Sequence, residues 1–135
     1  MKFDTLDGIW RLVDIRACIE STQRLTSPLG GNPMGTIVFS NRRMLAAVCD
    51  GDRNAAEAGE RSFHSYGGLY TFDGSTLEVV VDIASDPKWI GSNQVRAVVL
   101  LTEQEMLLRP PTRHYGESLE TRELIWERVW TAQGV

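Results

Sequence analysis

Short runs of β-branched, aromatic and aliphatic residues alternate with Gly, Pro, Asn and Asp along almost the whole chain. Runs of this length, bounded by turn-forming residues, predict β-strands. The first expected strand covers 8–20 and is long enough to bend partway, as strands of barrels do. The pattern predicts further strands over 35–40, 44–49, 68–72, 76–84, 94–101, 106–109 and 121–129.

The connections between these strands are nearly all short. Asn41-Arg42 and Asp73-Gly74 are expected turns, and the Ala-rich segment 54–65 is the one place where a short amphipathic helix is expected. Short connections favour antiparallel neighbours, and a single helix cannot cover a parallel sheet. We therefore expect one all-β domain over residues 1–135. Its predicted form is a closed antiparallel barrel of about eight strands with one short helix, because closure removes exposed sheet edges.

The period-2 pattern gives strands 76–84 and 94–101 one wholly apolar face each. These faces are formed by Leu77, Val79, Val81 and Ile83 and by Val95, Ala97, Val99 and Leu101. If they point inward, the charged residues on the opposite faces lie in water. If they point outward, the barrel holds a cavity with a few polar groups, and a helix or a partner subunit covers the apolar side. The alternation alone does not decide between the two.

The composition of the chain argues against two classes of partner, nucleic acids and membranes. The chain is 42% hydrophobic and 24% charged, as globular proteins are, and its net charge of −4 argues against binding nucleic acid. The longest apolar runs, 77–83 and 95–101, are far shorter than the ~20 residues that span a bilayer, so no membrane partner is expected. Two acidic residues in the first seven argue against a signal peptide, which predicts a cytoplasmic protein. Cys18 and Cys49 are accordingly expected to be reduced, small apolar residues.

Several segments resemble, in order, those of the bacterial lipocalin-like domain family. They are Gly8-Ile9-Trp10, the hairpin 34–44, the blocks 66–74 and 86–96, and Trp126-Glu127-Arg128. The resemblance spans nearly the whole chain and implies a lipocalin-like barrel. Such barrels include carriers and enzymes, so the function stays open. One position departs from the family pattern, because Arg42 stands in the hairpin turn where the family usually has Gly.

The resemblance also implies a structural pair. In lipocalins the tryptophan of the first strand packs across the closed end of the barrel, beneath an arginine of the last strand. The matching residues here are Trp10 and Arg128. A guanidinium over an indole adds a cation–π attraction of about 0.5–2 kcal/mol.

Candidate chemistry centres on the segment after the expected helix. His64 and Tyr66 can act as acid, base or hydrogen-bond donor at a barrel mouth, or serve as ordinary surface and wall residues. Asp82 and Arg96 flank the loop 85–93. They form a buried ion pair that could orient a ligand if both point inward, and a weak surface pair if both point outward. The candidate ligand-binding residues are His64, Tyr66, Tyr70, Asp82, Trp89, Arg96 and Trp126, of which His64, Tyr66 and Asp82 are the catalytic candidates if the protein is an enzyme.

The sequence contains no phosphate-binding glycine loop and no metal-ligand spacing, so neither a cofactor nor a metal is expected. The first hypothesis is a barrel that binds a small hydrophobic or amphipathic organic molecule. The alternative is a cofactor-free isomerase, cyclase or hydratase that acts on a small apolar substrate by acid–base catalysis. A third hypothesis is an interaction domain whose apolar outer face forms a homodimer.

Overall fold

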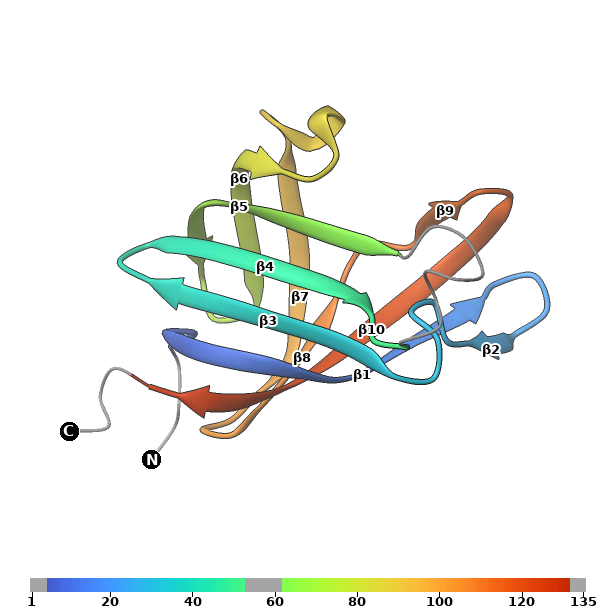
Figure 1. Cartoon of the computed structure of the whole chain (residues 1–135), viewed down its shortest axis with the longest axis horizontal. Coiled ribbons are helices and arrows are strands. Elements are labelled where there is room, and N and C mark those ends of the chain that lie inside the picture. The colour runs from blue at the N-terminus through green and yellow to red at the C-terminus, as the bar shows by residue number, and fades with distance from the viewer. Residues whose placement is uncertain (1–4, 53–61, 132–135) are drawn as a thin grey trace.

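A computed structural model of the chain describes residues 5–52 and 62–131 (Figure 1). Within these ranges the protein is all-β, apart from one 3-10 turn, η1 (Pro87–Trp89), and no helix there is long and apolar enough to span a membrane. The strands are β1 (Gly8–Ile19), β2 (Arg24–Thr26), β3 (Pro33–Ser40), β4 (Arg43–Asp50), β5 (Phe63–Phe72), β6 (Thr76–Ala84), β7 (Asn93–Leu101), β8 (Glu105–Arg109), β9 (Arg113–Tyr115) and β10 (Ser118–Trp130). The helix expected over 54–65 lies mostly outside the described residues, and its last part is wrong because β5 already begins at Phe63.

The predicted closed barrel is confirmed. Neighbouring strands pair antiparallel in the order β1-β3-β4-β5-β6-β7-β8-β10, and β10 pairs back onto β1 to close the ring. The short strands β2 and β9, which the sequence pattern did not predict, extend β1 and β10 beyond the ring. The eight ring strands therefore leave no free edge along the barrel wall.

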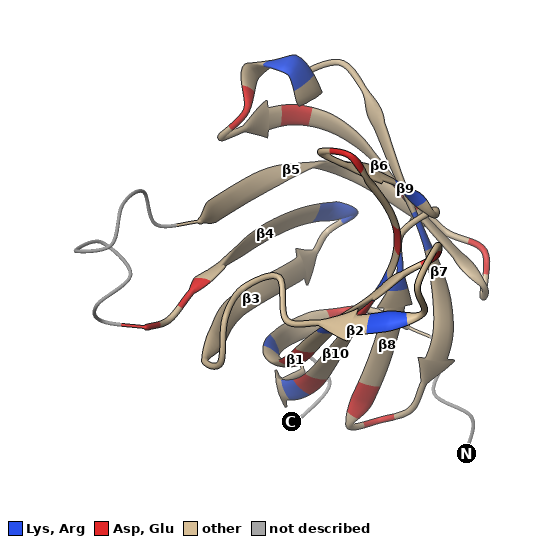
Figure 2. Cartoon of the chain, turned by 90° about the vertical axis from the view of Figure 1, so that its right-hand side faces the viewer, with Lys and Arg blue, Asp and Glu red and all other residues tan. Residues whose placement is uncertain are grey.

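Antiparallel order sends the connections alternately to the two ends of the barrel. The tight turns at 41–42, 73–75 and 102–104 share one end, called the turn end. The longer connections over 20–32, 85–92 and 110–117 share the other, called the loop end, where β4 also ends and β5 begins. Figure 2 views the barrel from the loop end, where β2 and β9 lie. The longer connections of the described residues therefore gather at one mouth of the barrel.

A bulge in β6 explains why only part of its apolar face is internal. Gly67 pairs with Ile83 and Gly68 with Val81, so Asp82 is an extra residue in the ladder. Leu77, Val79 and Val81 are buried as alternation predicts. Ile83 lies beyond the bulge and is 56% exposed. Alternation cannot locate an inserted residue, which reverses the faces of everything that follows.

In β7 the polar face points inward. Gln94, Arg96 and Val98 are buried, while Ala97 and Val99 on the opposite face are exposed. The simpler of the two arrangements, with the apolar face inside, is therefore wrong for this strand. A strand with Gln and Arg on its inner face indicates an interior that is not a uniform hydrocarbon core.

The turn end is sealed by the predicted tryptophan–arginine pair. The Arg128 guanidinium lies 4.2 Å from the centre of the Trp10 ring, which confirms the contact. The Trp10 indole N–H donates to the Leu6 carbonyl at 3.0 Å, and Arg128 donates to the Thr5 carbonyl at 2.7 Å. Trp10 and Leu6 are almost completely buried. The segment before β1 therefore crosses the barrel end and is fastened there from both sides.

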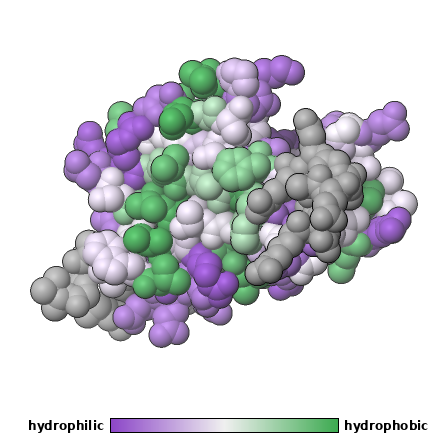
Figure 3. Space-filling view, viewed as in Figure 1, coloured by the Kyte–Doolittle hydropathy of each residue, from purple (hydrophilic) through white to green (hydrophobic). Residues whose placement is uncertain are grey.

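The outer face of β3 to β6 carries exposed apolar side chains. Val38 pairs with Leu45 across β3 and β4, and Leu69 pairs with Val80 across β5 and β6. All four are more than a third exposed, and Figure 3 shows apolar residues gathered on this side. A face of this kind fits the homodimer hypothesis, which stays a prediction.

The β3–β4 turn places an unfavourable residue in a left-handed conformation. Ser40 pairs with Arg43, so the loop consists of Asn41 and Arg42, with φ angles of 51° and 65°. Two positive φ angles define a type I′ hairpin turn, for which Asn followed by Gly is preferred. Asn tolerates this region, whereas an arginine there costs roughly 1–2 kcal/mol.

We expect Arg42→Gly to stabilise the protein by about 0.5–1 kcal/mol, since relief of the strain exceeds the added chain entropy of glycine. Urea unfolding of both proteins measures this difference. Arg16→Gly is the matched control, because Arg16 is an exposed residue within β1 where glycine weakens the strand. A lower midpoint for Arg42→Gly than for the parent protein would contradict the proposed strain.

Candidate ligand-binding cavity

A cavity of about 500 Å³ occupies the loop-end half of the barrel. Its apolar walls come from strands on opposite sides of the ring and from the connection before β3. They are formed by Ile15, Leu29, Ile37, Ala46, Val48, Leu108, Leu124 and Trp126. Trp126 is only 1% exposed, and its indole N–H has no hydrogen-bond partner among the described residues. The space persists because small residues such as Ala46 stand where larger side chains would fill it.

Aromatic side chains gather where the η1 turn meets β5. The Asp86 carboxylate accepts a hydrogen bond from the Lys88 backbone N–H at 3.0 Å and so begins the turn that carries Trp89. The Trp89 ring stacks on His64 at 6.0 Å and meets the edge of Tyr66 at 5.9 Å, between ring centres. All three line the cavity. The irregular segment 85–92 thus has a definite structure that directs an indole toward the cavity.

Arg96 enters the cavity wall from the inner face of β7 and is only 9% exposed. Its guanidinium donates to Gln94 Oε1 at 3.1 Å and to the Val95 carbonyl at 2.9 Å. The Gln94 amide donates in turn to Ser92 Oγ at 3.2 Å, and Ser92 donates to the Trp89 carbonyl at 2.5 Å. This relay fixes the arginine and the tryptophan loop relative to each other.

A second group of cations surrounds Tyr115. The guanidinium carbons of Arg122 and Arg113 lie 3.3 Å and 4.9 Å from the centre of its ring. Arg122 also pairs with Glu120 at 3.1 Å. Both arginines and His114 line the cavity, whose lining among the described residues contains no Asp or Glu. Because the whole chain carries a net charge of −4, the cavity concentrates positive charge in an acidic protein.

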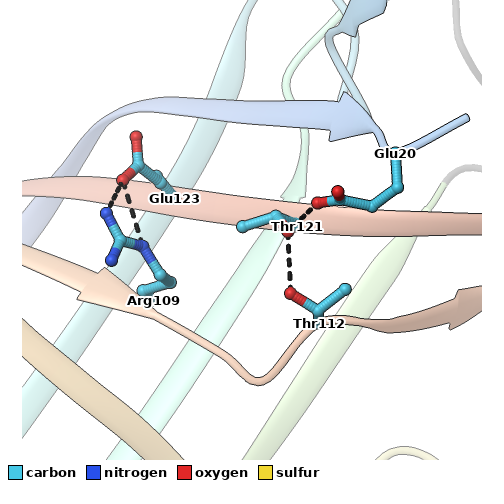
Figure 4. Close-up of polar contacts among 5 residues, drawn as sticks. All are labelled: Glu20, Arg109, Thr112, Thr121 and Glu123. Atoms are coloured by element: carbon cyan, nitrogen blue, oxygen red, sulfur yellow. Dashed lines mark hydrogen bonds and ion pairs between the residues drawn. The ribbon is translucent and has the colours of Figure 1, made fainter. Parts of the chain in front are cut away.

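Polar contacts on the other side of β10 fasten the strand that carries Arg122 (Figure 4). Thr121 donates its hydroxyl proton to Glu20 at 2.5 Å, and its oxygen lies 2.7 Å from the Thr112 hydroxyl. A hydroxyl has one proton, so Thr112 is the donor in the second contact. Arg109 pairs with Glu123 at 2.5 Å. These contacts join β10 to the end of β1, to β8 and to the segment that leads into β9.

The structure brings five of the seven candidate ligand-binding residues together. His64, Tyr66, Trp89, Arg96 and Trp126 all line the cavity. Their roles in binding or catalysis remain proposals.

The other two candidates lie elsewhere. Tyr70 is at the turn end, where its hydroxyl donates to Asp7 at 2.9 Å and its ring meets Phe39 edge-on at 5.0 Å. Burial and the neighbouring carboxylate raise the pKa of Tyr70. Asp82 lies on the outer surface in a two-bond pair with Arg43, both at 2.8 Å, and that hydrogen bonding lowers the pKa of Asp82.

Asp82 and Arg96 therefore do not pair in either of the two expected arrangements, because Asp82 lies on the outer face of the barrel wall and Arg96 on the inner face. Asp82 follows the inward-facing Val81 and points outward as alternation requires, whereas Arg96 lies on the inner face of β7. Arg43 and Asp82 are both exposed, so solvent and salt screen the attraction between them.

Arg113, Tyr115 and Arg122 were missed in the sequence. A usable pattern was present for Arg122, because alternation traced back from the inward-facing Trp126 passes through Leu124, Arg122 and Glu120. No comparable pattern exists for Arg113 and Tyr115. They belong to a strand of three residues, which is too short for any period to be recognised.

Comparison with known proteins agrees with this architecture. A family model described as a lipocalin-like domain matches residues 7–129. The crystal structure of an uncharacterized protein from Bacteroides eggerthii is similar in fold, with a TM-score of 0.50, 11% sequence identity, and coverage of 92% of this chain and 99% of that one. A search of curated proteins finds no match. An identity this low supports the fold and nothing further.

Proposed function

The chain belongs to the family of lipocalin-like domains, and from this premise we propose that its barrel binds a small amphipathic organic molecule in the loop-end cavity. The observation that carries the proposal is the cavity itself, with apolar walls and a few polar groups. Pockets for small molecules usually measure about 300–1,000 Å³ and have this composition. The volume of about 500 Å³ lies within that range.

The experiment is to block the cavity. Ala46 is buried in the cavity wall on β4, and Ala97 faces outward on β7, so Ala→Phe at the two positions forms a matched pair. A neutral, polarity-sensitive naphthalene fluorophore should bind the native protein at about one equivalent. We expect Ala46→Phe to weaken binding at least tenfold and Ala97→Phe to leave it unchanged, as measured by fluorescence titration.

Thermal unfolding of both variants shows whether each is folded before the titrations are compared. Equal affinities of the two folded variants would place the fluorophore outside the cavity. That result, or the absence of binding to the native protein, contradicts the proposed function.

The second candidate is the cofactor-free isomerase, cyclase or hydratase. It is supported by His64 and Tyr66, an acid–base residue and a hydroxyl donor that both line the cavity. Asp82 no longer supports it, because its carboxylate lies on the outer surface with Arg43. Native mass spectrometry of the purified protein can identify a co-purifying molecule. A His64→Gln variant that still holds that molecule but no longer converts it would favour the enzyme over the carrier.

A further inference from the structure

Arg96 is a buried cation without a buried anion. Among the described residues no carboxylate pairs with it, and its contacts are the neutral Gln94 amide, the Val95 carbonyl and the Tyr66 ring at 5.9 Å. Burying an unpaired charge costs several kcal/mol unless other groups compensate it. Two neutral acceptors compensate only in part. The residue is therefore suited to a partner that the protein does not itself supply.

The guanidinium has donors to offer that partner. Arginine carries five N–H groups, and the two hydrogen bonds made within the described residues leave three. The relay through Gln94 and Ser92 holds the group in one orientation, so little side-chain entropy is lost when an anion binds. A planar guanidinium held in this way matches the two oxygens of a carboxylate.

The surroundings of Arg96 reinforce this preference. The cavity lining contains two more arginines, Arg113 and Arg122, and no acidic residue among those described. Glu120 pairs with Arg122 next to the cavity. The cavity region therefore holds three arginines and one glutamate, a net positive charge. A low-dielectric space with an excess of positive charge favours an anion over a neutral molecule of the same shape.

We propose that the cavity selects organic carboxylates, with the apolar part of the molecule against Trp126 and the aliphatic wall and the carboxylate on Arg96. This inference rests on the proposed function, because it names the chemical class of the ligand for the same cavity. In this proposal Arg96 determines which ligands bind, by contacting their carboxylate, and does not merely support the fold.

The test compares three probes of one shape at pH 7: 2-naphthylacetic acid, the neutral 2-naphthylacetamide and the cationic 2-(2-naphthyl)ethylamine. Calorimetric titration of the native protein should give an affinity at least tenfold higher for the acid than for the amide, with the amine weakest. Arg96→Gln should lower the affinity for the acid to about that for the amide and so remove the preference for the acid. Arg109→Gln is the matched control, because Arg109 pairs with Glu123 outside the cavity and its loss should leave the preference intact.

Each outcome has a distinct meaning. Equal binding of acid and amide to the native protein overturns the carboxylate proposal but leaves the proposed function standing, and this comparison needs no variant. Retention of the preference in folded Arg96→Gln overturns the role of Arg96. If Arg96→Gln does not fold, Arg96→Lys keeps the charge without the planar fork and should lower the acid preference. Failure of all three probes and of the neutral fluorophore to bind would instead reject the proposed function.

Discussion

Replacing Gly68 by alanine is expected to destabilise the protein by about 3 kcal/mol or more. A Cβ atom at this position would lie 1.9 Å from the Val80 carbonyl oxygen and 2.8 Å from its carbon. Both atoms belong to the backbone of the neighbouring strand, next to the bulge at Asp82, so no side-chain rotation relieves the clash. β5 and β6 would have to separate locally, which breaks hydrogen bonds in the middle of the barrel wall.

Urea unfolding measures this loss, and Gly31→Ala provides the matched control. A Cβ at Gly31 meets no atom within 4 Å, and its backbone is not in the left-handed region. Its replacement should therefore change the free energy of unfolding by less than about 1 kcal/mol. If Gly68→Ala unfolds at the same urea concentration as Gly31→Ala, the close approach of β5 and β6 is not a feature of the native barrel.

Arg128→Ala is expected to cost about 2–4 kcal/mol of stability without changing ligand affinity. The substitution removes the cation–π contact with Trp10, worth about 0.5–2 kcal/mol, and the charged hydrogen bond to the Thr5 carbonyl, worth about 1.5–3 kcal/mol. It also uncovers the Trp10 ring at the turn end. The cavity lies at the opposite end of the barrel, so the substitution should lower stability without lowering ligand affinity.

Thermal unfolding and titration with the neutral fluorophore test both halves of this expectation. Arg11→Ala is the control on the adjoining strand, because Arg11 pairs with Glu127 on the exposed outer face and its loss should cost under about 1 kcal/mol. A large drop in affinity for Arg128→Ala would mean that the turn end and the cavity are coupled, contrary to their separation in the structure.

Much of this fold could be predicted because the chain obeys simple local rules. The turns at Asn41-Arg42 and Asp73-Gly74, the long first strand and the closing contact of Trp10 with Arg128 all follow from residue type and order. β2 and β9 could not be predicted, because three-residue strands exist through pairing with β1 and β10 rather than through their own composition.

The residues of the cavity were harder to predict than the strands, because the face that a residue presents depends on its tertiary setting. Whether Arg96 or Ala97 faces the interior depends on how β7 is set in the ring, and alternation does not supply that information. Asp82 lies outside because β6 turns its apolar face inward, whereas Arg96 lies inside because β7 turns its polar face inward, and the pattern of hydrophobic and polar positions does not show that the two strands differ in this way. His64 and Tyr66 could be predicted because they follow the segment expected to lie at the barrel mouth, and Trp89 because it lies within the loop 85–93; all three line the cavity.

The pairing of β1 with β10 has a consequence for how the barrel is made. Its residue pairs are more than 100 positions apart in sequence, the nearest being Ile19 with Glu120. Contacts of such separation form slowly, in the millisecond-to-second range for all-β domains, because a long chain must be ordered before they form. Until β10 leaves the ribosome, β1 and β8 remain open edges that can pair with another chain. The pairing of β10 with β1 and β8 removes all exposed edges from the native barrel. Because this pairing forms last, a chain that lacks β10 exposes two edges, one on β1 and one on β8.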